Sequence, residues 1–85
     1  AAGEFDRDQA RQLRRSSSSV VLNTAEGYGS RGGTKRVRYG NALGSARETL
    51  ANLEAAEAVG YLPELGEDVR DRLDHIIGTL VKLVY

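Results

Sequence analysis

The sequence predicts an all-α protein, an antiparallel bundle of helices. Apolar residues recur at helical spacing through three segments, and glycine and proline stand between those segments. The length of 85 residues suffices for one small domain. We expect helices at about 6–28, 34–59 and 64–84 in a single domain spanning 6–85, and we set residues 1–5 aside as a cloning scar or linker.

The first segment is the hardest to assign, because four consecutive serines at 16–19 also suit a flexible linker. We interpret it as a helix, since serine is only mildly unfavourable there and its small side chain lets another helix approach closely. A strand over 18–22 is the competing interpretation. The helical face would comprise Leu13, Ser17, Val20, Thr24 and Tyr28, beside Ala10, Val21 and Ala25.

The second and third segments carry clearer apolar stripes. Gly60 and Pro63 separate them and are typical stop and start signals, which favours a short antiparallel connection. Because the three stripes include many small residues, they bury modest area, and a further helix from a missing segment or another copy would help. The two stripes are Tyr39, Leu43, Ala46, Leu50 and Leu53, and then Val69, Leu73, Ile76, Leu80 and Leu83 with Ile77 and Val84.

The stretch "EGYGSRGGTK" contains a G-x-G-x-x-G pattern at Gly27, Gly29 and Gly32. A dinucleotide-binding loop needs a strand before these glycines, whereas a helix is predicted there. A Walker P-loop would need lysine where this chain has Gly33. We therefore expect a turn, in which Gly27 or Gly29 supplies the left-handed residue that ends the first helix.

Basic residues follow this turn, where the dipole of the next helix disfavours them. Thr34 is the expected N-cap, and Lys35, Arg36 and Arg38 crowd the first turns. Cations beside free N–H groups form an anion site, for which a phosphate backbone is the natural ligand. The candidate nucleic-acid-binding residues are Arg14, Arg15, Arg31, Lys35, Arg36 and Arg38.

The net charge of zero hides a division along the chain. Residues 1–40 hold eight Lys/Arg against four Asp/Glu, and residues 41–85 hold four against eight. The basic residues therefore have a second interpretation, as solvated charges or as partners of the acidic half of an adjacent subunit. Tyr28 and Tyr39 flank the basic loop and could stack on bases, although we expect packing for both.

The segments "QLRRSSSSVVLNTAEGYGSRGGTK" and "YGNALGSARETLANLEAAEAVGYL" resemble the four-helix bundle proteins first described from open reading frames in 23S ribosomal RNA intervening sequences. The resemblance runs from about Gln12 to Leu83. It implies an antiparallel four-helix bundle that assembles as a ring, with a pentamer expected, no known enzymatic activity and a nucleic-acid role. A related branch comprises the accessory proteins of diversity-generating retroelements, which work beside a reverse transcriptase. The family's long first helix is missing here, so about three helices are expected.

Asn23, Glu26, Gly27 and Gly29 are structural candidates. Glu26 near a helix C-terminus defies the dipole, so we expect an arginine or free N–H groups as its partner. Asn23, one turn back, is available to hydrogen-bond across a helix crossing. The sequence supports no catalytic residue, metal site or cofactor, because His75 is the single histidine and cysteine is absent.

We therefore expect a non-enzymatic homo-oligomer that binds RNA or DNA through its basic face. The alternative is a structural or adaptor protein that assembles and binds a protein partner such as a reverse transcriptase. Neither a membrane span nor a signal peptide is recognisable, and a cytoplasmic location is expected.

Overall fold

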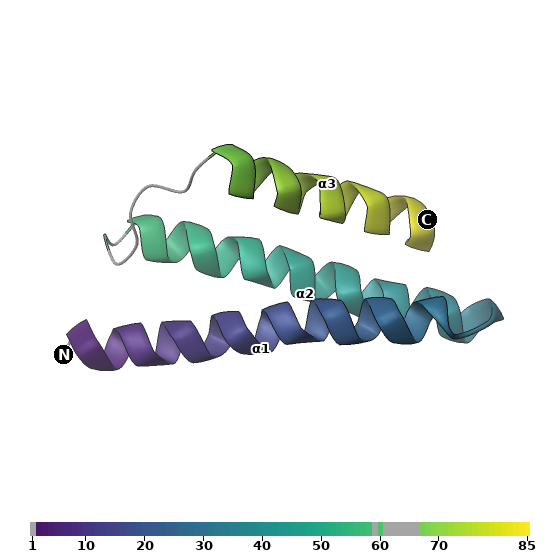
Figure 1. Cartoon of the computed structure of the whole chain (residues 1–85), viewed down its shortest axis with the longest axis horizontal. Coiled ribbons are helices and arrows are strands. Elements are labelled where there is room, and N and C mark those ends of the chain that lie inside the picture. The colour runs from purple at the N-terminus through teal and green to yellow at the C-terminus, as the bar shows by residue number, and fades with distance from the viewer. Residues whose placement is uncertain (1, 59, 61–66) are drawn as a thin grey trace.

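The computed structural model of the protein describes residues 2–58, 60 and 67–85. It confirms the predicted all-α bundle of about three helices. Within the described ranges the chain forms α1 (Ala2–Tyr28), α2 (Gly32–Ala58) and α3 (Glu67–Val84), and consecutive helices run antiparallel (Figure 1). The strand considered over 18–22 is wrong, because these residues lie inside α1.

The helix boundaries differ from the prediction at both described starts. α1 begins four residues earlier than expected, and α2 begins two residues earlier, at Gly32. Thr34 therefore lies inside the first turn of α2 and is not its N-cap. The predicted helix end at 59 and helix start at 64 fall outside the described residues.

Gly60 is confirmed as the signal that ends α2. Its backbone is left-handed, with φ of +80°. Its N–H donates to the carbonyl of Glu57 at 3.1 Å, which satisfies one of the free carbonyls at the helix end. Only glycine adopts this conformation without a steric penalty.

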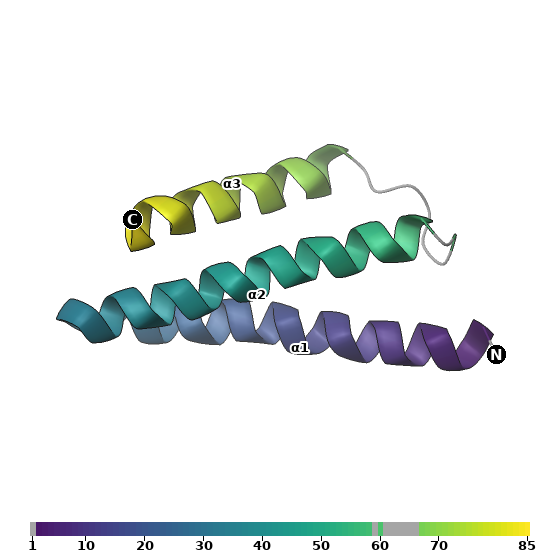
Figure 2. The ribbon, with the colours of Figure 1, turned by 180° about the vertical axis from the view of Figure 1, so that it is seen from behind.

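The helices form a flat arrangement with α2 in the middle, α1 along one side and α3 along the other (Figures 1 and 2). The Cα extents are 46 × 25 × 15 Å. Both outer helices pack against α2. A shallow apolar groove of about 340 Å³ remains between α1 and α3, lined by Thr24, His75, Ile76, Thr79, Leu80 and Leu83.

The core lies where α2 meets its two neighbours. The predicted stripes are confirmed at four buried residues of this core, Tyr39, Leu43, Ala46 and Leu80, and Ala42 is buried beside them. The side chains of Val20, Ile77, Val81 and Val84 pack around this cluster. Because three of the five buried core residues are larger than alanine, each of them carries much of the apolar burial.

The buried face of α1 is rotated relative to the predicted stripe. Ser16 is buried, whereas Val21 is 70% exposed. The reason is a set of hydroxyl contacts with α2: Ser19 Oγ lies 2.7 Å from Ser45 Oγ, and the Thr49 hydroxyl donates to Ser16 Oγ at 2.9 Å. Small side chains bring the two backbones close, as the sequence predicted, and the hydroxyls then satisfy one another.

Candidate nucleic-acid interface

A short turn, residues 29–31, joins α1 to α2 at one end of the molecule (Figure 1). The Gly29 N–H donates to the carbonyl of Ala25 at 3.2 Å, and the Ser30 N–H donates to that of Gly27 at 3.1 Å. The Ser30 hydroxyl donates to the Glu26 carbonyl at 2.6 Å. Three hydrogen bonds thus satisfy carbonyls at the end of α1 and hold the turn in place.

The predicted left-handed role of Gly27 or Gly29 is wrong. In the described part of the chain, positive φ occurs at Gly32, at +59°, and at Gly60. Ser30 takes over the capping that a left-handed glycine would provide, because its hydroxyl and N–H both reach back into α1. The positive φ at Gly32 instead lies where the chain enters α2.

Gly27 has a different function, which is to let α2 approach. A Cβ atom added to Gly27 would lie 2.7 Å from Cε1 of Tyr39 and 2.8 Å from its Cδ1. The Tyr39 ring is 6% exposed, so it has little room to move away. The expectation that Tyr39 belongs to the core is confirmed.

Glu26 forms the ion pair that the sequence analysis anticipated. Its Oε2 lies 2.8 Å from Nη1 of Arg38, which ties the end of α1 to the start of α2. Both side chains are partly exposed, so the pair contributes little stability, about 0 to 1 kcal/mol. Its main consequence is electrostatic, because one of the candidate cations already has an anionic partner.

Asn23 does not bond across the helix crossing as expected. Its Nδ2 donates within α1, to the carbonyl of Ser19 at 2.9 Å and to the Ser19 hydroxyl at 3.0 Å. A residue four positions along a helix lies directly over its partner, so this bond needs no second helix. The link to α2 passes through Ser19 and Ser45 instead.

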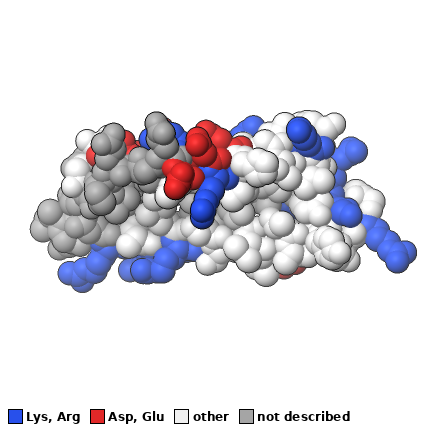
Figure 3. Space-filling view, turned by 45° about the horizontal axis from the view of Figure 1, so that its top comes forward, with Lys and Arg blue, Asp and Glu red and all other residues white. Residues whose placement is uncertain are grey.

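Three cations lie in or directly after the turn that joins α1 to α2. They are Arg31, Lys35 and Arg36, and we call these three residues the basic end. None of them forms an ion pair with any residue that the structure describes. Lys35 Nζ lies 6.0 Å from the centroid of the Tyr39 ring, at the limit of a cation–π contact. Figure 3 shows blue side chains gathered at this end of the molecule.

The end of the bundle opposite the basic end carries charges of both signs. From residue 9 to residue 47 the chain carries eight Lys/Arg and one acidic residue, Glu26, but Arg11, Arg14 and Arg15 lie on the half of α1 that is far from the turn. The end of α2 and the start of α3 meet at the opposite end, where Arg70 pairs with Glu54 at 3.4 Å and Glu57 at 3.5 Å. Most of the acidic side chains visible in Figure 3 lie away from the basic end, and blue side chains project at the opposite end as well.

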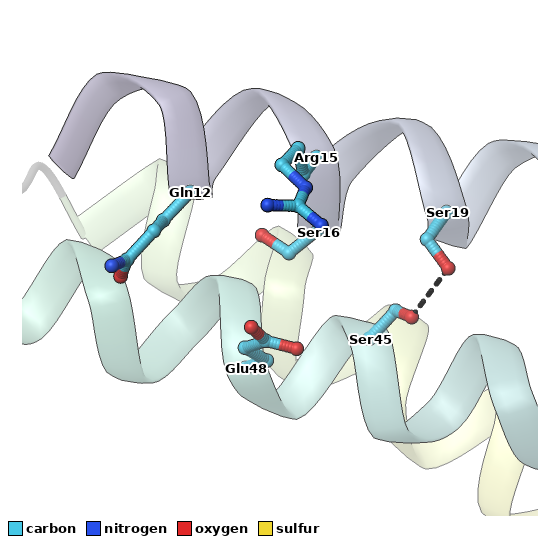
Figure 4. A pocket seen from close by; sticks show the side chains of 6 residues that line it. All are labelled: Gln12, Arg15, Ser16, Ser19, Ser45 and Glu48. Atoms are coloured by element: carbon cyan, nitrogen blue, oxygen red, sulfur yellow. Dashed lines mark hydrogen bonds between the residues drawn. The ribbon is translucent and has the colours of Figure 1, made fainter. Parts of the chain in front are cut away.

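Arg14 and Arg15 do not join the basic end. They precede Tyr28 by at least 13 residues of continuous helix, or about 20 Å at 1.5 Å per residue. Arg15 instead lines a polar cleft between α1 and α2 with a volume of about 570 Å³ (Figure 4). The structure thus divides the six candidate cations between the turn and the flank of α1.

The polar cleft brings together charges and hydroxyls from two helices. Arg15 extends from α1 and Glu48 from α2, while the hydroxyls of Ser19 and Ser45 bond each other at its edge (Figure 4). These hydroxyls are already occupied by structural hydrogen bonds. The polar lining of the cleft is therefore explained by the packing of α1 against α2 through hydroxyl side chains.

Tyr28 is exposed, contrary to the packing expected for it. Its side chain is 83% accessible to solvent at the last position of α1, beside the basic end. The geometry explains the exposure: Gly27 faces α2, and the next residue is rotated by about 100° around the helix. The sequence analysis named Tyr28 as one of two residues that could stack on bases, but it could not anticipate this orientation.

The described residues include no group of three or more His, Cys, Asp or Glu side chains placed to hold a metal ion. His75 is exposed on α3. Among the described helices, none combines the length and apolar character of a membrane span.

Comparison with known families completes the description of the site. The model of the 23S rRNA-intervening sequence protein family matches residues 4–82. The chain belongs to this family. The match includes α2, the turn and the basic end, and it confirms the resemblance found in the sequence. Comparison with curated proteins and with solved structures finds no match. The 23S rRNA-intervening sequence proteins are not a known enzyme family.

Proposed function

We propose that this 23S rRNA-intervening sequence protein binds RNA through the phosphate backbone at its basic end. The observation that carries the proposal is that Arg31, Lys35 and Arg36 have no ion-pair partner among the described residues. The nearest acidic residue in the sequence, Glu26, is occupied by Arg38. An anion arriving at this end therefore meets free cations.

The backbone adds to this attraction. α2 has no acidic residue in its first turn, so nothing there offsets the positive end of the helix dipole. Phosphate contacts position a nucleic acid without reading its bases, so we expect weak sequence specificity. The family description refers to ribosomal RNA, which makes RNA the first ligand to test and DNA the comparison.

The proposal is tested by fluorescence anisotropy with labelled RNA and DNA of equal length at two salt concentrations. Each phosphate contact contributes a slope of about 0.7 to 0.9 in log affinity against log salt, so three contacts predict a loss of about 20- to 40-fold between about 50 and 200 mM salt. Salt-dependent binding supports the proposal. Absence of binding at the lower concentration contradicts it.

Replacing Glu26 with glutamine is expected to tighten RNA binding several-fold and to steepen its salt dependence by about one contact. The reason is that Arg38 loses its partner at 2.8 Å and becomes available to a phosphate. Glu48→Gln is the matched control, because it removes the same charge from an exposed residue of the distant polar cleft. Equal effects of the two substitutions would indicate a response to net charge alone.

We propose as a second function that the bundle assembles with itself, with a ring of five copies as the initial expectation, or serves as an adaptor for a protein partner such as a reverse transcriptase. The supporting observation is the apolar surface of α1, where Val21 is 70% and Leu22 59% exposed, together with the groove between α1 and α3. Light scattering tests assembly directly. A mass equal to one chain of 9.2 kDa contradicts it.

A further inference from the structure

Tyr28 combines high exposure with a fixed position. Its side chain is 83% exposed, yet it follows Gly27, whose contact with the Tyr39 ring sets the approach of α1 to α2. On its other side, the turn is held by the hydroxyl of Ser30, which donates to the Glu26 carbonyl at 2.6 Å. The aromatic ring is therefore presented to solvent from a well-anchored segment of backbone.

Tyr28 also lies at the same end of the molecule as cations that have no anionic partner among the described residues. Arg31 follows Tyr28 by three positions, and Lys35 and Arg36 open the next helix. An exposed aromatic ring next to a basic surface is the combination by which proteins bind single-stranded nucleic acid: the cations contact the backbone and the ring stacks on a base. A base already stacked and paired in a duplex is not available to such a ring.

We propose that the basic end selects nucleic acid with unpaired bases, one of which stacks on Tyr28 while the adjoining phosphates contact Arg31, Lys35 or Arg36. This inference rests on the proposed function and goes further, because phosphate binding alone does not distinguish a single strand from a duplex. Stacking tolerates any base, so the selectivity is for strandedness and not for sequence.

The test compares two labelled RNAs with equal numbers of phosphates, an unstructured oligouridine and a blunt-ended duplex. Tyr28→Ala is expected to weaken binding of the oligouridine by about 5- to 150-fold, the range that corresponds to stacking of one base. Binding of the duplex is expected to change less than about two-fold, since it depends on the cations alone. Tyr28→Phe keeps the ring and is expected to retain the preference.

Two further variants make the result specific to stacking. Val37→Ala is the control for loss of an exposed side chain without an aromatic ring, because Val37 on α2 is 61% exposed. It is expected to change the affinity for neither RNA. The chain contains no tryptophan, so Tyr28→Trp introduces a single indole whose fluorescence should be quenched by oligouridine and not by the duplex.

The outcomes separate this inference from the proposed function. Replacing the cations could abolish binding of both RNAs while Tyr28→Ala leaves it unaffected. That result would overturn the stacking role and leave the phosphate-binding proposal intact. Equal weakening of both RNAs by Tyr28→Ala also overturns it. If light scattering shows that Tyr28→Ala forms a smaller assembly than the unmodified protein, and its preference for the single strand is unchanged, Tyr28 would be assigned to a protein interface. Failure of the unmodified protein to bind either RNA would overturn both proposals.

Discussion

Replacing Arg31, Lys35 and Arg36 together with glutamine is expected to weaken RNA binding by about 100-fold or more while the bundle stays folded. Contacts between a charged donor and an acceptor contribute about 1.5 to 3 kcal/mol each, so loss of even two of the three would produce this effect. Anisotropy titration at low salt measures the loss, and the salt dependence of any residual binding should be nearly flat.

The same substitutions should not lower stability, which distinguishes a binding role from a structural one. Lys35 lies in the first turn of α2, where the helix dipole disfavours a cation by about 0.3 to 1 kcal/mol. Removing that charge therefore leaves the free energy of unfolding unchanged or slightly raises it. Positive charge at a site where it does not stabilise the helix is consistent with a ligand-binding role.

A matched variant controls for net charge. Arg11, Arg47 and Arg72 are exposed on the three helices, and replacing them with glutamine removes the same total charge away from the turn. RNA binding is expected to change only a few-fold in this control, since each cation acts over a screened distance of about 10 Å. Comparable losses in the two triple variants would show that RNA responds to the overall charge and would contradict a defined basic end.

The sequence predicted the fold well because helical periodicity is a strong local signal. The stripe through Tyr39, Leu43 and Ala46 became the buried face of α2, and Gly60 ended that helix as expected. The face of α1 was harder to predict, since serine at position 16 gives no apolar signal even though it is buried against Thr49. Its burial follows from a hydroxyl partner on another helix, which periodicity along one segment cannot reveal.

The candidate site was predictable in composition but not in arrangement. The mismatch between Glu26 and the helix dipole correctly indicated an arginine partner, and the structure identifies it as Arg38. The grouping of Arg14 with the turn failed, because residues close in sequence separate by 1.5 Å for every position along a helix. The exposure of Tyr28 depended on which face of α1 meets α2, and that choice was decided by Gly27 and the small residues before it.

Replacing Gly27 with alanine is expected to destabilise the protein by up to about 2 kcal/mol. Alanine is the better helix former by about 1 kcal/mol, but overpacking a tight contact costs about 1 to 3 kcal/mol, and the added Cβ would lie 2.7 Å from a ring carbon of Tyr39. The ring is buried and cannot swing aside without displacing the core. Urea denaturation measures the change.

Gly44→Ala isolates the packing contribution, because Gly44 lies in the same bundle, inside α2, and a Cβ there meets nothing within 4 Å. This substitution should stabilise the protein by about 0.5 to 1 kcal/mol through helix propensity alone. Opposite signs of the stability change for the two glycines would establish that Gly27 sets the approach of α1 to α2.

The contact can then be assigned to Tyr39 by combining Gly27→Ala with Tyr39→Leu. The smaller side chain removes the clashing ring, so the double variant should be more stable than the sum of the single effects predicts. Additive effects would mean that the helices accommodate the methyl group by separating. That separation would also shift the turn that carries Tyr28 and Arg31. A change in the RNA affinity of Gly27→Ala would therefore connect the packing of the bundle to its proposed function.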